Sequence, residues 1–383
     1  MNVISKKTIR RGSRIRVLVV DDSVVIRRLV THALEEDAAI EVVGSAPNGL
    51  VALAKIPQLN PDLITLDIEM PEMDGIETLR RLRQLYTLRD VRVIMFSTLT
   101  ARGASATFDA LSAGADDYVS KASNEGSLAR SMDTLRNELI PKIKQFFSFE
   151  EGGRTATVLP RIAVQAPRPF LPSLARSMRS APELVVIGVS TGGPNALGAI
   201  MPMFPADFPL PILIVQHMPP MFTRLLAERL DSICKLCVEE AVDGAVVERG
   251  KVLIAPGNYH MRVCKTASKT CVQLDQGPQE NSCRPSVDVL FRSAEEAIGP
   301  GVISVILTGM GCDGQRGAEV LKAHGAYVIA QDETTSVVWG MPGAVVNAGL
   351  ADVVLPLNEI VPEIVRCSSR CVAYCGSASA RRN

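Results

Sequence analysis

Short apolar runs alternate with segments whose apolar residues recur at helical spacing, and this alternation occurs twice along the 383-residue chain. An apolar run followed by an amphipathic pattern predicts a strand and then a helix. Repeated strand–helix units predict a parallel sheet covered by helices on both faces, so we predict an α/β protein with two doubly wound domains. The predicted strands lie at residues 16–20, 40–46, 62–67, 91–97 and 116–121 in the first domain, and at 183–190, 211–218, 251–257, 302–309, 327–332 and 351–357 in the second.

Two segments lack this periodicity. Residues 141–182 are rich in Pro, Arg, Ser and Ala, which is typical of a linker, and residues 363–383 form a short Cys-containing end. We therefore expect domains over 14–140 and 183–362, separated by the linker and followed by a flexible tail. A pair of runs at 259–264 and 270–275 predicts an antiparallel hairpin that interrupts the parallel pattern of the second domain.

Composition narrows the classes of partner. The formal net charge is +0 and 47% of the residues are hydrophobic, so no excess charge attracts nucleic acid or an anionic membrane. The first residues lack the apolar core of a secretory signal, and no run of about 18 apolar residues predicts a membrane span. We expect a cytoplasmic protein that neither binds nucleic acid nor inserts into a membrane. One C-x-x-C pair, Cys234 and Cys237, has no second ligand pair beside it, which favours reduced structural thiols.

Polar side chains follow the predicted strands of the first domain. Asp21 and Asp22 follow the first strand, and Asp67 ends the third. Ser97 ends the fourth strand and Lys121 the fifth. Because the carboxyl ends of parallel strands share one edge, these side chains should meet there. Clustered carboxylates favour a divalent cation such as Mg²⁺, and the set can direct a phosphoryl group to an Asp. Taken singly, each Asp could instead be a helix cap.

Four motifs surround these residues: "VDDS" (20–23), "LDIEMPEMDG" (66–75), "FSTLT" (96–100) and "SK" (120–121). With them the first domain resembles the receiver domain of two-component response regulators. The resemblance implies a flavodoxin-like fold, phosphorylation of Asp67 by a partner histidine kinase, and Mg²⁺ held by Asp21, Asp22 and Asp67. The switch residues that it implies are Ser97, Tyr118 and Lys121. Ala122 departs from the family pattern, which has proline after the lysine.

The stretch "VVIGVSTGGPNAL" (185–197) opens the second domain and contains the G-x-S-x-G pattern of a serine on a tight strand-to-helix turn. Alone, it leaves three roles open for Ser190: a nucleophile, a phosphate ligand or a turn residue. His217 ends the next strand and Asp313 follows a later one, so both should share the strand edge with Ser190. A histidine oriented by a buried carboxylate can take the proton of a serine hydroxyl, which predicts a Ser190–His217–Asp313 triad.

Two simpler interpretations oppose this triad. A nucleotide loop would use the same glycines, but no P-loop lysine follows and G-x-G-x-x-G is not met. His217 could be a hydrogen-bonded core histidine without a chemical role. His260 and His324 are expected at the surface, which leaves His217 as the candidate base.

Six motifs occur in order along the second half of the chain: "GVSTGGP" (188–194), "QHMP" (216–219), "LIAPG" (253–257), "RPSVDVLF" (284–291), "LTGMGCDG" (307–314) and "WGMPGAV" (339–345). With these motifs the second half resembles the catalytic domain of the chemotaxis protein-glutamate methylesterase and glutamine deamidase family. The resemblance implies hydrolysis of glutamate methyl esters on the cytoplasmic helices of methyl-accepting chemoreceptors, with release of methanol, and deamidation of receptor glutamines. It implies that Ser190 attacks the ester and His217 transfers the proton, without a cofactor for the ester chemistry. Backbone N–H groups near Met310 would stabilise the oxyanion, and Thr191 would shape the turn.

We therefore expect a serine esterase that is activated when phosphorylation of Asp67 weakens the packing of the first domain on the catalytic cleft. A response regulator with a non-catalytic, partner-binding output domain is the alternative. A nucleotide-binding output domain is the third hypothesis.

Overall fold

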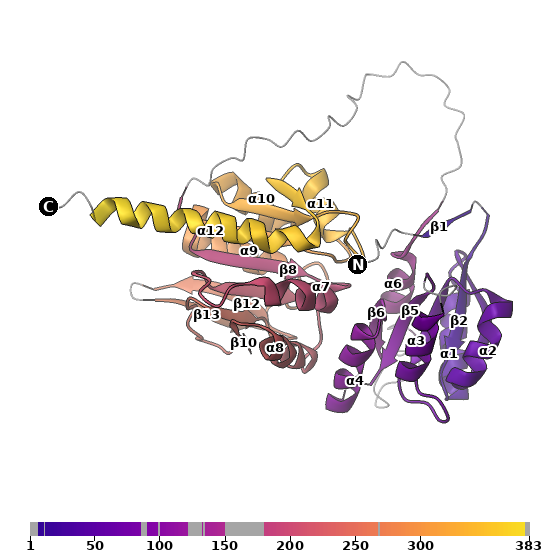
Figure 1. The fold of residues 1–383 in the computed structure, drawn as a ribbon. Helices are drawn as coiled ribbons and strands as arrows, with labels where there is room; N and C mark the ends of the chain where they lie inside the picture. Colours follow the sequence, from indigo (N-terminus) through magenta and orange to yellow (C-terminus); the bar gives the residue numbers. More distant parts are fainter. Residues whose placement is uncertain are drawn as a thin grey trace, which may run out of the picture.

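The computed structural model describes residues 7–10, 12–85, 90–98, 100–121, 132, 135–149, 180–266 and 269–379, with the backbone alone at 101, 149 and 370–379. Most of the predicted linker and Ala122 therefore lie outside the described residues. The two domains lie side by side, the first in indigo and magenta and the second in magenta to yellow (Figure 1). None of the helices in the described ranges is long and apolar enough to cross a bilayer.

The first domain is a five-stranded parallel sheet in the order β3-β2-β4-β5-β6, the flavodoxin-like order, which confirms the predicted fold class. Its central strand β4 is buried at every position, which is why its sequence is a nearly continuous apolar run. Register pairs Val20 with Leu66 and Asp67 with Phe96, so the strand ends are level. The strands are β2 (Ile15–Val20), β3 (Ile40–Ala46), β4 (Leu63–Asp67), β5 (Arg92–Ser97) and β6 (Asp117–Ser120), and the helices are α1 (Val24–Glu35), α2 (Gly49–Leu59), α3 (Gly75–Gln84) and α4 (Ala101–Ser112).

The chain stays ordered beyond residue 140, where the sequence pattern of the first domain ends. Helix α6 (Ile140–Lys144) buries Ile143, and Phe146 is buried directly after it. Strand β7 (Phe147–Phe149) then pairs in parallel with β1 (Lys7–Ile9). The start of the expected linker thus packs on the first domain, through isolated aromatic side chains that show no period.

The second domain is a seven-stranded parallel sheet in the order β10-β11-β9-β8-β14-β15-β16. The chain passes from β8 to one side of the sheet and later returns to β14 on the other side, so the strand order reverses beside β8. The edge strand β10 was not predicted, because its sequence, Cys-Val-Glu-Glu, contains no apolar run. The strands are β8 (Leu184–Val189), β9 (Ile212–Gln216), β10 (Cys237–Glu240), β11 (Lys251–Ile254), β14 (Val302–Ile306), β15 (Tyr327–Gln331) and β16 (Val353–Leu355).

Helices cover both faces of this sheet, and the predicted hairpin is present. Strands β12 (His260–Lys265) and β13 (Thr270–Asp275) form a separate antiparallel sheet. The hairpin packs on α9 (Val287–Ile298), where the Val263 N–H donates to Ser293 Oγ at 3.0 Å. The other helices include α7 (Gly193–Ile200), α8 (Phe222–Ile233), α10 (Gln315–His324) and α11 (Met341–Asn347).

The last helix, α12 (Leu357–Ser379), continues well past residue 362, where the sequence pattern predicts the start of a flexible tail. Ile364 and Cys367 are buried in it. The first part of the expected tail is therefore a packed helix, although Pro362 lies inside it. As the sixth residue of the helix, Pro362 has no N–H to donate to the carbonyl four residues before it, so one hydrogen bond of the helix is missing there.

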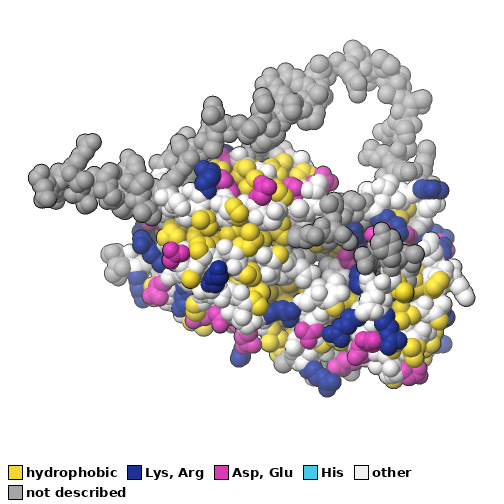
Figure 2. All heavy atoms as spheres, in the orientation of Figure 1, with side chains coloured by type: hydrophobic (Ala, Val, Ile, Leu, Met, Phe, Trp, Pro, Cys, Tyr) yellow, Lys and Arg dark blue, Asp and Glu magenta, His cyan; other side chains and the backbone are white. Residues whose placement is uncertain are grey.

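The two domains meet through α4 of the first and α7 and α8 of the second. Phe108 and Phe222 have ring centroids 6.2 Å apart. Asn195 donates to the Leu111 carbonyl at 3.1 Å, and Arg229 donates to Ser112 Oγ at 2.6 Å. Buried residues of both domains belong to one apolar cluster. The gap between the ribbons of α4 and α8 in Figure 1 is filled by side chains in Figure 2.

Candidate active site

The three predicted catalytic residues follow three adjacent strands of the second sheet. Strand β8 lies between β9 and β14, and Val189 pairs with Gln216, so Ser190 and His217 follow paired positions. The His217 N–H donates to the Val189 carbonyl at 3.2 Å, and the Ser190 N–H donates to the Thr308 carbonyl at 3.0 Å. Ser190 therefore lies where the strand order reverses, the usual position of a site in such sheets.

Glycines allow the chain to turn closely around Ser190. Gly192 has a φ of +77°, which a residue with a side chain rarely adopts. Gly309 is packed so tightly that a Cβ there would lie 2.7 Å from the Cβ of Ser190. Met310 follows Gly309, and no described residue accepts a hydrogen bond from its N–H. The Met310 N–H is thus free to point at charge that develops beside Ser190.

Two polar residues support this turn. Thr308 Oγ1 donates to the Thr191 carbonyl at 2.9 Å, and Thr191 is buried. Gln216 Nε2 donates to the Ser190 carbonyl at 2.9 Å. The sequence reasoning missed Gln216, whose one signal is its place immediately before His217.

His217 and Asp313 are directly bonded. His217 Nε2 lies 2.8 Å from Asp313 Oδ2. Burial of the His217 ring lowers its pKa, but the hydrogen bond to Asp313, the nearby Cys283 thiol and the charge of Asp313 outweigh burial and raise it above the ordinary value. Since Nε2 faces the carboxylate, Nδ1 is the nitrogen that can accept a proton. No hydrogen bond joins the Ser190 hydroxyl to His217 in the described part of the chain.

Asp313 is held at the start of helix α9. The Val287 N–H donates to Oδ2 at 2.7 Å and the Asp288 N–H to Oδ1 at 3.1 Å. Burial raises the pKa of Asp313, but the hydrogen bond from His217, the charge of His217 and these two N–H groups hold it well below the usual range. Asp313 is therefore ionised and can stabilise a protonated His217.

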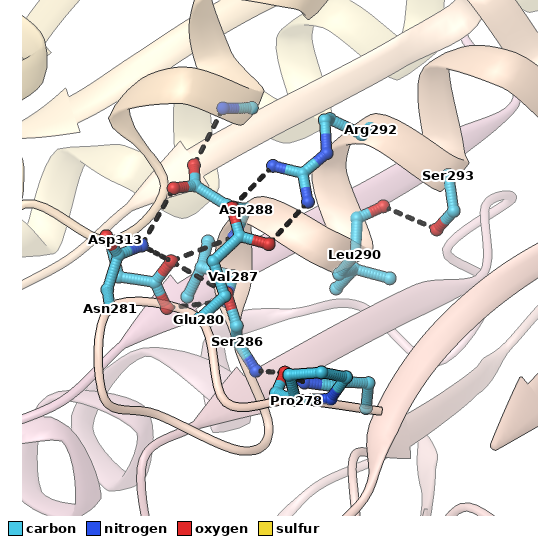
Figure 3. A network of polar contacts seen from close by, with 12 residues as sticks. Pro278, Glu280, Asn281, Ser286, Val287, Asp288, Leu290, Arg292, Ser293 and Asp313 are labelled. Carbon is cyan, nitrogen blue, oxygen red and sulfur yellow. Dashed lines mark hydrogen bonds and ion pairs between the residues drawn. The ribbon is translucent and has the colours of Figure 1, made fainter. Parts of the chain in front are cut away.

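Side chains of the loop before α9 complete this network. Ser286 Oγ and Asn281 Nδ2 each donate to Asp313 Oδ1 at 2.9 Å. Asn281 Nδ2 also donates to Asp288 Oδ2 at 2.9 Å, so its amide lies between two carboxylates (Figure 3). The motif at 284–291 thus holds Asp313 through Ser286, Val287 and Asp288.

Cys283 is a site residue that the sequence reasoning missed. Its Sγ lies 3.6 Å from His217 Nδ1. The only sequence signal is that it directly precedes the 284–291 motif. The thiols of Cys234 and Cys237, which have metal-ligand spacing, are free and lie apart from the triad.

His260 and His324 were both expected at the surface, but only one of them lies there. His324 is exposed, but His260 is buried, so that expectation was wrong. His260 Nε2 lies 2.9 Å from the Pro278 carbonyl, and the Ser286 N–H donates to Nδ1 at 3.2 Å. His260 is the hydrogen-bonded core histidine, and it supports the loop that carries Ser286.

The acidic residues of the first domain also meet at one strand edge. Lys121 Nζ lies 2.7 Å from Asp67 Oδ2 and 3.0 Å from Asp21 Oδ2. Asp21, Asp22 and Asp67 offer ligand oxygens within 4.8 Å of one another, and Asp21 Oδ2 is buried without an aligned hydrogen bond. Burial and the charges of Asp21 and Asp22 outweigh Lys121 and raise the pKa of Asp67 to about 6. This oxygen set fits a hard divalent cation.

Of the three predicted switch residues, Lys121 contacts the carboxylates, whereas Ser97 and Tyr118 contact other parts of the structure. Ser97 Oγ donates to the Gly103 carbonyl at 3.1 Å and accepts from Thr107 Oγ1 at 2.6 Å, both in α4. Tyr118 is buried at the domain interface, and its ring stacks on Phe222. We call the cluster of Asp21, Asp22 and Asp67 the acidic pocket. Ser97 therefore connects the acidic pocket to α4, and Tyr118 connects β6 to the second domain.

Comparison with known proteins places both halves of the chain. The "CheB methylesterase" family model matches residues 185–364, and the "Response regulator receiver domain" model matches residues 17–133. A relative from Trichodesmium erythraeum, named protein-glutamate methylesterase/protein-glutamine glutaminase, is 50% identical over 353 residues, which cover 92% of this chain and 99% of that protein. A relative of the same name from Nocardioides sp. is 53% identical over 355 residues, covering 92% and 95%.

Among solved structures, the catalytic domain of Thermotoga maritima CheB methylesterase is 46% identical, covers 49% of this chain and 99% of its own, and has a TM-score of 0.48. The receiver model thus matches the first domain and the methylesterase model the second. The chain belongs to the CheB methylesterase family, with a response regulator receiver domain followed by a methylesterase domain.

Proposed function

We propose that this chain hydrolyses glutamate methyl esters on the cytoplasmic helices of chemoreceptors, and deamidates receptor glutamines, at Ser190, His217 and Asp313. The observation that carries the proposal is the ionised Asp313 bonded to His217 at the strand edge that also presents Ser190. A serine that shares a strand edge with a histidine bonded to a buried carboxylate is suited to acyl transfer. The non-catalytic alternative gives no reason for this arrangement.

In the first half of the reaction, Ser190 Oγ attacks the ester carbonyl while His217 Nδ1 takes the hydroxyl proton. The Met310 N–H stabilises the oxyanion. His217 then returns the proton to the methoxy group, and methanol leaves an acyl-enzyme. In the second half, water attacks this intermediate, His217 again transfers the proton, and the free glutamate side chain is released. With a glutamine side chain, the same steps release ammonia.

Regulation is proposed to start at Asp67, which accepts a phosphoryl group from a histidine kinase. Mg²⁺ bound by Asp21, Asp22 and Asp67 would neutralise the oxygens of that group. Lys121, which contacts Asp67 at 2.7 Å, would then pair with the phosphoryl oxygens. The Ser97 hydroxyl would leave α4 for the phosphoryl group, and the movement of α4 and Tyr118 would loosen the contact with α7 and α8.

The test is methanol release from membranes that carry methylated receptors, with and without a small-molecule phosphodonor. Ser190→Ala should abolish release under both conditions. Ser369→Ala changes an exposed serine of α12 and serves as the matched control, with unchanged release. Full release by Ser190→Ala would reject the assignment of the nucleophile and favour a non-catalytic output domain.

A further inference from the structure

We propose that His217 and Cys283 form a binding site for a thiophilic divalent metal ion of the Zn²⁺ class, and that the bound ion blocks the esterase. The block rests on the proposed role of His217, whereas the site itself depends on geometry alone. The pair lies in the catalytic centre, but the ester reaction assigns no role to the Cys283 thiol.

The separation of the two side chains is suited to a metal that bridges them. Cys283 Sγ lies 3.6 Å from His217 Nδ1. Zinc–sulfur bonds of about 2.3 Å and zinc–nitrogen bonds of about 2.0 Å, at a tetrahedral angle, place the two ligand atoms roughly 3.5 Å apart. An ion can therefore enter between Sγ and Nδ1 with almost no movement of either side chain.

The far side of the imidazole is already arranged as in metal sites. A histidine ligand commonly donates its other ring N–H to a carboxylate, which fixes the tautomer and raises the basicity of the ligating nitrogen. His217 Nε2 faces Asp313 Oδ2 at 2.8 Å, which leaves the lone pair on Nδ1 directed at the thiol. The ligand atoms of His217, Cys283 and Asp313 all lie within 4.8 Å of one another.

The backbone that carries the Cys283 thiol is held by hydrogen bonds within its own loop. The Cys283 N–H donates to the Glu280 carbonyl at 2.9 Å, and the Glu280 N–H donates to the Cys283 carbonyl at 3.1 Å. Both carboxylate oxygens of Glu280 accept from Arg292 of α9, at 2.8 and 2.6 Å (Figure 3). The same helix carries the N–H groups that fix Asp313. Both sides of the site are thus anchored to the start of α9, so little ordering is needed when an ion binds.

The site is also accessible. Cys283 is half-buried, and the His217 side chain is 13% exposed. Two protein ligands leave two tetrahedral positions for water, as in zinc sites that keep open coordination. Because Nδ1 is the nitrogen that takes the Ser190 proton, an ion on Nδ1 removes the general base. The result is reversible inhibition by a soft metal, separate from the control exerted through Asp67.

Binding of Co²⁺ to the full chain tests the site directly. The chain is first freed of metal with a chelator, and excess Mg²⁺ is then added to occupy the carboxylates of the receiver domain. We expect one equivalent of Co²⁺ to give a thiolate-to-metal absorption band, and Zn²⁺ to displace it. Cys283→Ser should lose the band and weaken binding by at least about 10-fold, since one of two ligands is gone. Cys312→Ser, which removes an exposed thiol beside Asp313 in the chain, should keep both.

Two further variants protect the test against misfolding and against failure of the proposed reaction. Asp313→Asn keeps both ligands but loses the carboxylate behind His217, and should weaken Co²⁺ binding about 10- to 100-fold. Ser190→Ala should bind Co²⁺ like the wild type, because the site does not need the nucleophile. Equal binding by Cys283→Ser and wild type, or loss of the band in Cys312→Ser, would overturn the proposal. In methanol-release assays, Zn²⁺ should inhibit the wild type, and a chelator should restore its activity.

Discussion

The ring of Tyr118 lies flat against the ring of Phe222, with centroids 4.9 Å apart and an interplanar angle of 5°. Tyr118 belongs to β6, which ends beside the acidic pocket, whereas Phe222 begins α8 in the methylesterase domain. Neither ring can move far without displacing the other, because both are buried. The strand that leads to Lys121 is thus coupled to a helix that follows His217 in the chain.

Loosening the domain interface at its rim should raise the esterase activity of the unphosphorylated protein. Arg229 of α8 donates to Ser112 and Asp109 of α4. Arg229→Ala removes these contacts at a cost of about 0–1 kcal/mol, since the pair is exposed. We expect a modest increase in basal methanol release. Arg224→Ala is the matched control, because Arg224 pairs only with Glu228 of its own helix among the residues described. Equal effects of the two substitutions would contradict the coupling.

Activation should depend on Asp67 and on Mg²⁺. Asp67→Asn should abolish the increase in methanol release that a small phosphodonor causes, while basal release persists. Chelation of Mg²⁺ should have the same effect on the wild type, because Asp21 and Asp22 would then lack the cation that shields the phosphoryl oxygens. Asp90→Asn changes an exposed carboxylate of the same domain and should leave activation intact. Normal activation of Asp67→Asn would place the phosphorylated residue elsewhere.

The esterase should lose activity as the pH falls through a value above the ordinary histidine pKa of about 6.5. Asp313 raises the pKa of His217, so the ring becomes protonated at a higher pH, and only the neutral ring can take the Ser190 proton. Asp313→Asn should lower kcat by about 10⁴-fold and shift the acidic limb of kcat/KM toward lower pH. A wild-type profile that stays flat down to pH 5 would contradict the assignment of His217 as the base.

Space around Ser190 should be as critical as its hydroxyl. In Gly309→Ala the new Cβ would lie 2.4 Å from Met341 Sδ and 2.7 Å from Ser190 Cβ, so the turn must move. We expect at least about a 10²-fold loss of kcat, given the sensitivity of catalysis to small misplacements. Gly198→Ala in α7 is the control, because nothing lies within 4 Å of its new Cβ. It should preserve activity and raise the unfolding free energy by about 0.5–1 kcal/mol. Unchanged kcat in Gly309→Ala would show that Ser190 tolerates displacement.

The sequence predicted most of what depends on strand ends. Apolar runs mark the parallel strands, and the residues after them must share one edge, which is why Asp21, Asp67 and Lys121 meet in one domain. The same rule places Ser190 beside His217 in the other. Segments without an apolar run gave weaker signals: the sequence of β10 is Cys-Val-Glu-Glu, and β7 pairs with a distant strand at the start of the chain.

Contacts between loops could not be predicted from the sequence. Cys283 meets His217 only because the loop before α9 folds back over the sheet, and the buried His260 supports that loop from a hairpin. Periodicity fixes which residues face a sheet edge, but not which loop covers that edge. The sequence by itself thus determined two parallel α/β domains and the strand ends that carry their chemistry. Tertiary packing alone decided that Asp313 is ionised at the start of α9, that Cys283 faces Nδ1, and that Tyr118 rests on Phe222, because each depends on side chains brought together from distant segments.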